Sequence, residues 1–175
     1  MTTPRQLSLD VLAQLSGQVE AGCYRYLLWR TWGTGRRVLF IMLNPSTANA
    51  TEDDQTIRRC RAFARAWGFD GMDIVNIFAL RSTDPAALYA HRDPIGPLND
   101  TTITDAARRC GRVVCAWGHH GKLLARGSAV LRLLWDLGVK PMVLGLTARL
   151  AQPRHPLYLR RDVELFYLLR EPPLP

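Results

Sequence analysis

The chain has 175 residues, 47% of them hydrophobic and 22% charged, with a formal net charge of +8. This balance is close to that of globular proteins and excludes a largely disordered chain, and the length predicts a single domain, residues 1–175. No apolar run reaches the ~20 residues of a membrane span and no secretory leader is recognisable, so we expect a cytoplasmic protein that does not bind a membrane.

The basic residues are almost all arginines. Only Lys122 and Lys140 are lysines, so 21 of the 23 basic residues are arginine. Arginine forks bidentately onto phosphate and stacks on bases, which favours a nucleic-acid partner. A GC-rich genome produces the same bias, so the charge alone leaves this question open.

The first half of the chain predicts two strands and a helix. Residues 1–22 form a poorly patterned lead-in, with a helix predicted over 9–19, and the main domain spans 23–170. Alternating residues over 24–32 predict a strand, and residues 38–43 are apolar on both faces, as a central parallel strand must be. Helical spacing follows over 56–67.

The second half repeats the alternation of strand and helix. Buried strands are predicted over 72–78, 112–117 and 141–146. The helices between them are a short one opened by Pro85, one capped by Asn99 or Asp100, and a long one that follows Gly118 and ends at Gly138. The remaining tail is mostly irregular.

This order predicts an α/β fold: three α/β/α layers around a mostly four-stranded parallel sheet, because parallel neighbours need crossover connections. Ligands bind such sheets at the carboxyl ends of the strands. Four loops should therefore meet at one edge, namely 44–49, 76–81, 118–122 and 146–155.

Two asparagines end strands at this edge. Asn44 leaves a buried strand and precedes Pro45; its amide can hold a water or a heterocycle edge, although Asn-Pro is also ordinary turn chemistry. Asn76 lies between apolar neighbours, and a buried amide without partners costs ~1–3 kcal/mol. It either braces a neighbouring loop or hydrogen-bonds a ligand such as a base edge.

The other two loops carry basic groups. Residues 117–122, WGHHGK, suit an anion such as phosphate, or are a plain strand-to-helix turn. His155 lies between two prolines that fix its backbone, and nearby arginines favour its neutral form. A lone loop histidine is otherwise usually incidental.

Carboxylates and cysteines add two further expectations. Asp53 or Asp54 suits the N-cap of the following helix, and either is a minority candidate for a general base near Asn44. The four cysteines form no C-x-x-C pair and are interpreted as buried free thiols, so no metal and no cofactor is expected.

Read in order, these motifs resemble the uracil-DNA glycosylase superfamily, in which a strand ends in a water-activating Asp or Asn followed by Pro. A second strand there ends in a base-reading Asn, a third in a Trp-Gly-like turn, and a late loop carries His-Pro. The matching residues lie within 38–160 and are Asn44-Pro45, Asn76, Trp117-Gly118 and His155-Pro156. The mismatch-specific branch is the most similar, because it also has Asn-Pro.

The strings LNPSTANATEDDQTIRRC, VNIFALRSTDP, AWGHHG and GLTARLAQPRHPLYL are also similar to a bacterial family, domain of unknown function 1643. That resemblance spans nearly the whole chain from Tyr24. It implies the fold and carries no established substrate.

The superfamily resemblance implies a flipped base, water held by Asn44, a base edge bound by Asn76 beside Pro45 and Phe78, and His155 donating to the base carbonyl. Phosphate contacts are implied for Ser46, Thr47, His119, Lys122, Arg149 and Arg154. No Asp occupies position 44, so hydrolysis is either slow or uses Asp53 or Asp54.

The leading hypothesis is therefore a monomeric DNA glycosylase-like hydrolase of a damaged or modified base, with DNA a better expected partner than RNA. One alternative is a non-catalytic nucleic-acid binder on the same fold. Another is a hydrolase of a free nucleoside or nucleotide, which gains if the arginines do not line the rim of the pocket.

Overall fold

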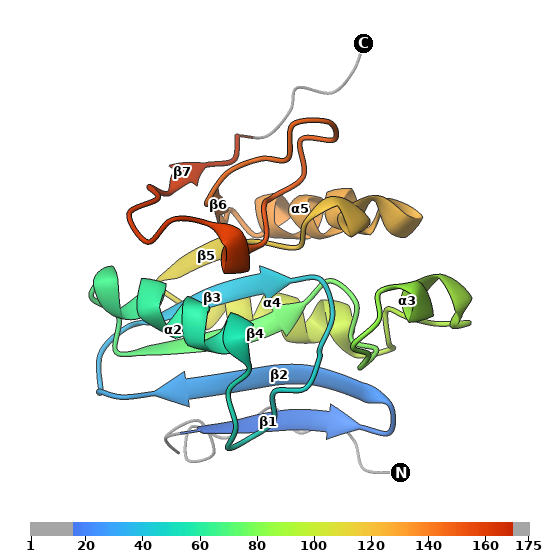
Figure 1. Ribbon diagram of the computed structural model, residues 1–175, viewed down its shortest axis with the longest axis horizontal. Helices are drawn as coiled ribbons and strands as arrows, with labels where there is room; N and C mark the ends of the chain where they lie inside the picture. The colour runs from blue at the N-terminus through green and yellow to red at the C-terminus, as the bar shows by residue number, and fades with distance from the viewer. Residues whose placement is uncertain (1–15, 170–175) are drawn as a thin grey trace.

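The computed structural model describes residues 16–169, except for the side chain of Tyr158. Within these residues one seven-stranded mixed sheet has the order β1-β2-β4-β3-β5-β6-β7 (Figure 1). The strands are β1 (Ser16–Ala21), β2 (Tyr24–Thr31), β3 (Arg37–Met42), β4 (Gly71–Asn76), β5 (Arg112–Cys115), β6 (Met142–Val143) and β7 (Phe166–Tyr167). The predicted α/β class is confirmed.

The four strands expected to be parallel form the centre of this sheet. β3 pairs in parallel with β4 on one side and β5 on the other, and β5 pairs in parallel with β6. Antiparallel strands extend both edges, with β2 on β4, β1 on β2, and β7 on β6. The expected four-stranded parallel sheet is therefore the centre of a larger mixed sheet. β2 was predicted as a strand, whereas β1 and β7 were not, because β1 is largely polar and β7 has two residues.

The lead-in is the clearest error of prediction. Residues 16–19, placed in a helix from the sequence, belong to β1 and pair with β2; residues 9–15 lie outside the described residues. Gly17 opposes Trp29, and a Cβ at Gly17 would lie 2.1 Å from the indole ring. Such an edge strand needs glycine for close approach, which hides the alternating pattern of a strand.

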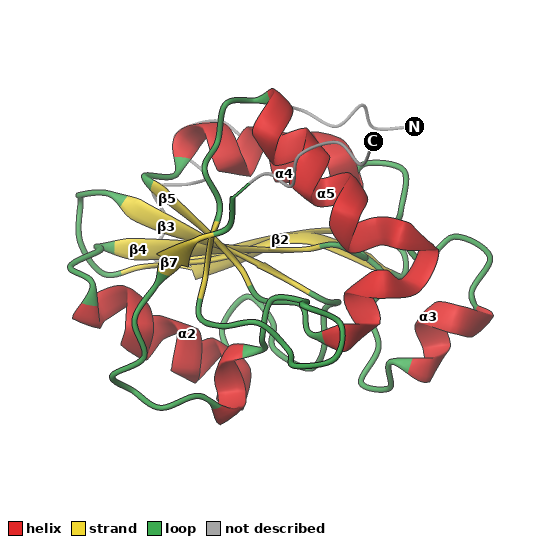
Figure 2. Cartoon of the chain, turned by 90° about the horizontal axis from the view of Figure 1, so that it is seen from above, coloured by secondary structure: helices red, strands yellow, loops and turns green. Residues whose placement is uncertain are grey.

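Helices cover both faces of the sheet. Figure 2 shows α2 (Gln55–Ala66) on one face and α4 (Asn99–Arg109) with α5 (Arg126–Asp136) on the other, while α3 (Ala86–Ala90) lies beyond the carboxyl ends of the strands. Alternate residues of β3 supply both cores: Val38, Phe40 and Met42 pack with the α2 side, Leu39 and Ile41 with the α4–α5 side. None of the helices in residues 16–169 has the length and apolar character to cross a bilayer.

The long helix predicted after Gly118 is broken into two pieces. A 3-10 segment, η1 (His119–Ala125), precedes α5, and Leu124 and Ala125 have φ values of 53° and 50°. The left-handed conformation ends one helix before the next begins. Asn99 is also not a cap: Leu98 holds the N-cap position and Asn99 is the first, buried residue of α4.

The break at Ala125 gives a stability prediction. Left-handed backbone costs an L-residue ~1–2 kcal/mol that glycine avoids, so Ala125→Gly is expected to raise the free energy of unfolding by about 0.5–1 kcal/mol. Ala129→Gly within α5 is the matched control and should lower it by about 1 kcal/mol. Urea unfolding of both variants checks this, and a loss of stability in both would contradict it.

Candidate functional site

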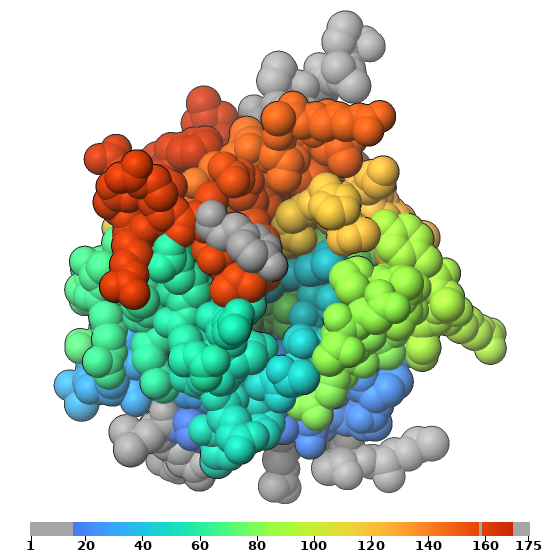
Figure 3. Space-filling model, in the orientation of Figure 1, coloured from blue at the N-terminus to red at the C-terminus, as the bar shows by residue number. Residues whose placement is uncertain are grey.

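A cavity of about 560 Å³ lies at the carboxyl ends of β3, β4 and β5. Figure 3 shows the hollow between the teal segment leading into α2, the green segment around α3 and the orange C-terminal segment. All four loops predicted to meet at this edge contribute to it. The lining comprises Arg25, Met42, Leu43, Asn44, Ser46, Asp54, Thr56, Ile57, Ile74, Asn76, Ser82, Thr83, Pro85, Trp117, Gly118, His119, His120, Thr147, Arg154 and His155.

The carboxyl end of β4 is held by side chains of α4 and α5. The Nδ2 of Asn99 donates to the carbonyl oxygens of Asn76 and Ile77, at 3.0 and 2.9 Å, and the Nε of Arg126 donates to Ile77 at 2.7 Å. These bonds satisfy carbonyls that the sheet leaves unpaired. The backbone that carries Asn76 is therefore held rigidly.

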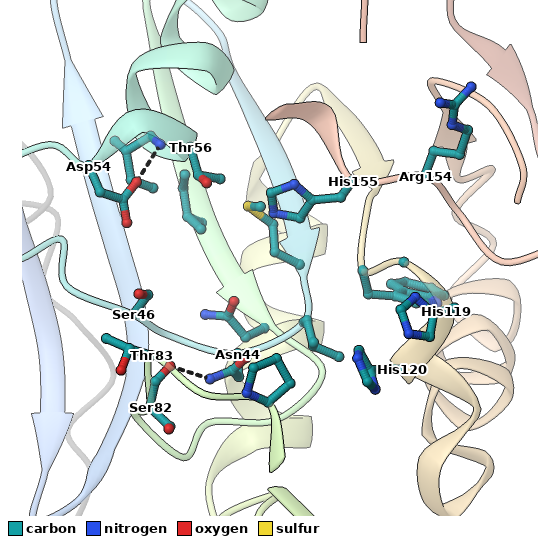
Figure 4. A pocket seen from close by; sticks show the side chains of 18 of the residues that line it. Asn44, Ser46, Asp54, Thr56, Ser82, Thr83, His119, His120, Arg154 and His155 are labelled. Atoms are coloured by element: carbon teal, nitrogen blue, oxygen red, sulfur yellow. Dashed lines mark hydrogen bonds between the residues drawn. The ribbon is translucent and has the colours of Figure 1, made fainter. Parts of the chain in front are cut away.

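Asn44 is oriented by the loop after β4. Its Nδ2 donates to the carbonyl oxygen of Ser82 at 2.8 Å and to that of Pro45 at 3.1 Å (Figure 4). Because loop carbonyls occupy the amide hydrogens, the amide oxygen of Asn44 is the group left to accept a hydrogen bond.

Asn76 is a buried polar residue whose side chain has no partner among the described residues. It is 3% exposed and lines the cavity, and its side-chain amide makes no hydrogen bond to any described residue. The predicted alternative, that it braces a neighbouring loop, is therefore not what the amide does. One donor pair and one acceptor remain available to a ligand.

His155 presents a defined tautomer. Its Nδ1 accepts from the backbone N–H of Leu157 at 3.3 Å, which leaves the ring proton of the neutral imidazole on Nε2. Burial lowers the pKa of His155, and the negative charge of Asp54 opposes that shift. The neutral ring is a hydrogen-bond donor in the wall of the cavity.

Because burial and Asp54 act in opposite directions on the pKa of His155, removing the Asp54 charge should shift that pKa measurably. Asp54→Asn removes the charge that raises the pKa of His155, so that pKa should fall further below its ordinary value of 6.5. Any activity that needs neutral His155 should fall as pH drops through the lowered pKa, and the acid limb should move to lower pH in Asp54→Asn. NMR titration of the imidazole nitrogens measures this, with Asp84→Asn, which is exposed, as control. An unchanged or raised pKa in Asp54→Asn would contradict it.

Several expected phosphate contacts lie at the cavity or beside it. Ser46, Arg154 and His119 line it, whereas Lys122 and Arg149 line an adjoining cavity of about 460 Å³ that shares His119 and Thr147. The rings of His119 and His120 are 3.9 Å apart between centroids, and the Tyr89 hydroxyl lies 3.0 Å from the Nδ1 of His120.

Four sequence-predicted site residues lie elsewhere. Asp53 binds Arg30 at 2.7 Å and Arg61 at 3.2 Å and does not line the cavity, so it does not fit a general base. Phe78 is fully buried in the core, and Thr47 is exposed outside both cavities. Pro45 meets the site only through its carbonyl, which accepts from Asn44 and from Ser82.

Asp54, and not Asp53, is the N-cap of α2, and it also lines the cavity. Its Oδ1 accepts from the N–H of Ile57 at 2.8 Å, which caps α2, and the residue lines the cavity. Capping at the helix N-terminus stabilises the carboxylate as an anion. Asp54 is thus the carboxylate that faces Asn44 and His155 in the same cavity.

Sequence reasoning missed several lining residues: Arg25, Thr56, Ser82, Thr83, His120 and Thr147. Ser82 and Thr83 follow the predicted loop by one and two residues, and His120 was considered only as part of the WGHHGK segment. Arg25 lies in a strand whose alternation suggested nothing chemical. Thr56 is a first-turn helix residue, for which the sequence carries no signal of function.

Most arginines do not line the rim. Many are paired within the fold, as in Arg37 and Arg109 with Asp73, Arg126 with Asp100, and Arg30 with Asp53. Others stack on rings near the opposite edge of the sheet: Arg61 and Arg65 on Trp32, Arg36 and Arg112 on Phe69. The cavity itself contains Arg25 and Arg154.

The thiols offer little chemistry. Cys60 and Cys115 are buried, as interpreted, and burial raises the pKa of both. Cys110 is only partly buried, and the interpretation as a buried thiol is wrong for Cys23, which is exposed. Within the part of the chain that the structure describes, no three metal-ligating side chains gather.

Comparison with known proteins identifies one family. The model of the family described as "Protein of unknown function (DUF1643)" matches residues 25–157, a span that includes Asn44, Asn76 and His155. No curated protein and no solved structure matches the chain.

Proposed function

Since the chain belongs to the family described as "Protein of unknown function (DUF1643)", we propose its function from the cavity: it hydrolyses the N-glycosidic bond of a nucleotide. The expected substrate is a damaged or modified base in DNA, flipped out of the stack into the cavity. The resemblance of the motifs to the uracil-DNA glycosylase superfamily led to this proposal.

The observation that supports this reaction is that three polar side chains in one cavity have hydrogen-bonding groups available to a ligand. Asn76 is buried with a free amide, His155 is a neutral donor, and Asn44 has an acceptor oxygen to spare. An amide reads a base edge that presents one donor and one acceptor. A neutral donor stabilises negative charge that grows on a base oxygen as the base leaves.

Water is the second reactant. The amide oxygen of Asn44 accepts one hydrogen of the water and so directs a lone pair toward C1′ of the sugar. The bond from C1′ to the base nitrogen breaks, the base takes the bonding electrons, and the water oxygen forms the new bond to C1′. The proton that this water loses passes to the Asp54 carboxylate or to the leaving base anion.

Asp54 supplies the carboxylate that position 44 lacks. Its capped carboxylate lies in the same cavity and stabilises the positive charge that develops on the sugar, or accepts the proton of the attacking water. Asp53 has no such role because two arginines bind it.

A free nucleotide is the second candidate substrate. The specific observation in its favour is that most arginines of residues 16–169 are paired or lie away from the rim, so these residues do not form an extended phosphate-binding surface around the cavity. Binding to an extended duplex relies on many such contacts. The hydrolytic chemistry is the same for both substrates.

The test is a screen for free base. Wild-type protein is incubated with duplex and single-stranded oligonucleotides that carry deaminated, alkylated or oxidised bases, and with the matching free nucleotides. Release of base from any of them supports the proposed reaction, and the better substrate selects between the two candidates. Intact substrate in every case, with salt-dependent oligonucleotide binding, would instead favour a non-catalytic binder.

A further inference from the structure

Arg25, in β2, is a buried cation in the wall of the cavity. Its side chain is 3% exposed; its Nη1 donates to the carbonyl oxygen of Ala48, and its Nε makes no hydrogen bond. Removing a charge from water without a compensating partner is costly, so proteins seldom leave a guanidinium in this condition.

The other buried arginines show what Arg25 lacks. Among the described residues three arginines are buried, and two of them bind carboxylates: Arg30 pairs with Asp53 and Arg126 with Asp100. None of the ion pairs in residues 16–169 includes Arg25. Within residues 16–169 no carboxylate therefore pairs with Arg25, and Arg25 lines the cavity.

Hydroxyl groups line the same cavity. Ser46 and Thr83 make no side-chain hydrogen bond to any described residue, whereas the Ser82 hydroxyl donates to the carbonyl oxygen of Asp84. Figure 4 shows Ser46, Ser82 and Thr83 grouped on one side of the cavity, away from His119 and His120. A guanidinium with free hydroxyls is a donor set suited to phosphate oxygens.

The charges around Arg25 are compatible with an anion. Burial, and then the charge of Arg81, lower its pKa to about 10, so Arg25 remains a cation at neutral pH. Asp54 opposes that shift and lies beyond ion-pair distance, and its carboxylate is already stabilised by the first turn of α2.

We infer that Arg25, with the hydroxyls of Ser46 and Thr83, forms a subsite for the terminal phosphate of a nucleotide. An internal phosphodiester continues into chain on both sides and does not reach a side chain this deeply buried, whereas a phosphate monoester does. The inferred substrate class is a nucleoside monophosphate, free or at a strand end. The inference rests on the proposed function in taking the ligand of Asn76 to be a nucleobase.

Equilibrium binding tests the subsite without requiring turnover. Calorimetry compares the four common deoxynucleoside 5′-monophosphates with the corresponding nucleosides on wild type, Arg25→Gln and Arg81→Gln. Arg81 is exposed and pairs with Glu20 outside the cavity. Arg81→Gln therefore removes one positive charge near Arg25 without changing the proposed subsite.

Wild type and Arg81→Gln should bind the monophosphates at least about tenfold more tightly than the nucleosides, because charge-assisted bonds are about twice as strong as neutral ones. That advantage should disappear in Arg25→Gln and be partly retained in Arg25→Lys. Equal affinity for both ligands in wild type, or an advantage that survives in Arg25→Gln, would overturn the subsite.

If Arg25→Gln does not fold, the wild-type protein supplies the answer. Titration with inorganic phosphate should shift the Nε–H resonance of Arg25, and an unchanged resonance would reject the subsite. A 5′-phosphorylated oligonucleotide, its 5′-hydroxyl counterpart and the free nucleotide separate the two sources of a terminal phosphate.

The two proposals fail in different ways. Phosphate-dependent binding without release of base leaves the subsite standing and rejects the reaction. Release of base at equal rates from substrates with and without a terminal phosphate supports the reaction and rejects the subsite.

Discussion

His155→Ala is expected to lower kcat for base release by about 10²–10³-fold, the usual effect of removing one preorganised donor to a developing oxyanion. The Nε2–H of His155 is the donor in question, and the bond from Leu157 to Nδ1 holds it in place. Because the donor acts as charge develops, kcat should fall far more than KM rises. Single-turnover release of base measures the effect.

The control is His91→Ala, the same change at an exposed histidine outside the cavity. His91→Ala should leave kcat unchanged, and His155→Gln, which restores an N–H donor, should recover part of the loss. Equal kcat in wild type and His155→Ala would reject the role assigned to His155.

Asp73→Asn should produce the largest loss of stability. Asp73 is fully buried in β4 and binds Arg37 and Arg109, the latter at 3.0 Å. Removing the charge leaves two guanidiniums without their anion, which typically costs about 3–5 kcal/mol. For a chain of this size that corresponds to a Tm lower by about 6–20 °C.

Asp105→Asn is the matched change on the surface, where Asp105 faces Arg108 across one turn of α4. Exposed pairs contribute little, so its free energy of unfolding should stay within about 0.5 kcal/mol of wild type. Urea unfolding measures the free energy of unfolding of both variants. Comparable losses in the two would contradict the stabilising role assigned to Asp73.

The central strands could be predicted because each is buried on both faces. β3 is apolar from Val38 to Met42, and the apolar pair Ile74-Val75 of β4 is followed closely by the buried Ile77 and Phe78. Such runs have few other interpretations. Edge strands lack that signal, as β1 shows with Gly17 against Trp29. The break at Leu124 and Ala125 was also invisible, because neither residue is one that usually adopts a left-handed conformation.

The site followed the topology, and its details depended on distant contacts. Asn44, Asn76 and His155 meet because parallel strands end at one edge. The sequence alone does not distinguish Asp53 from Asp54. Arg30, 23 residues before Asp53, forms an ion pair with Asp53, whereas Asp54 lines the cavity. Arg25 was missed because its burial depends on the loop that carries Ala48, which no periodicity in β2 reveals.

The most direct measurement of the central claim is release of free base by wild type and by the Asn44→Ala/His155→Ala double variant under single-turnover conditions. Asn44 and His155 act on different reactants, water and the leaving base. The proposal predicts free base from at least one modified nucleotide or oligonucleotide with wild type, and none above background with the double variant. Release by the double variant at the wild-type rate would contradict the roles assigned to this cavity.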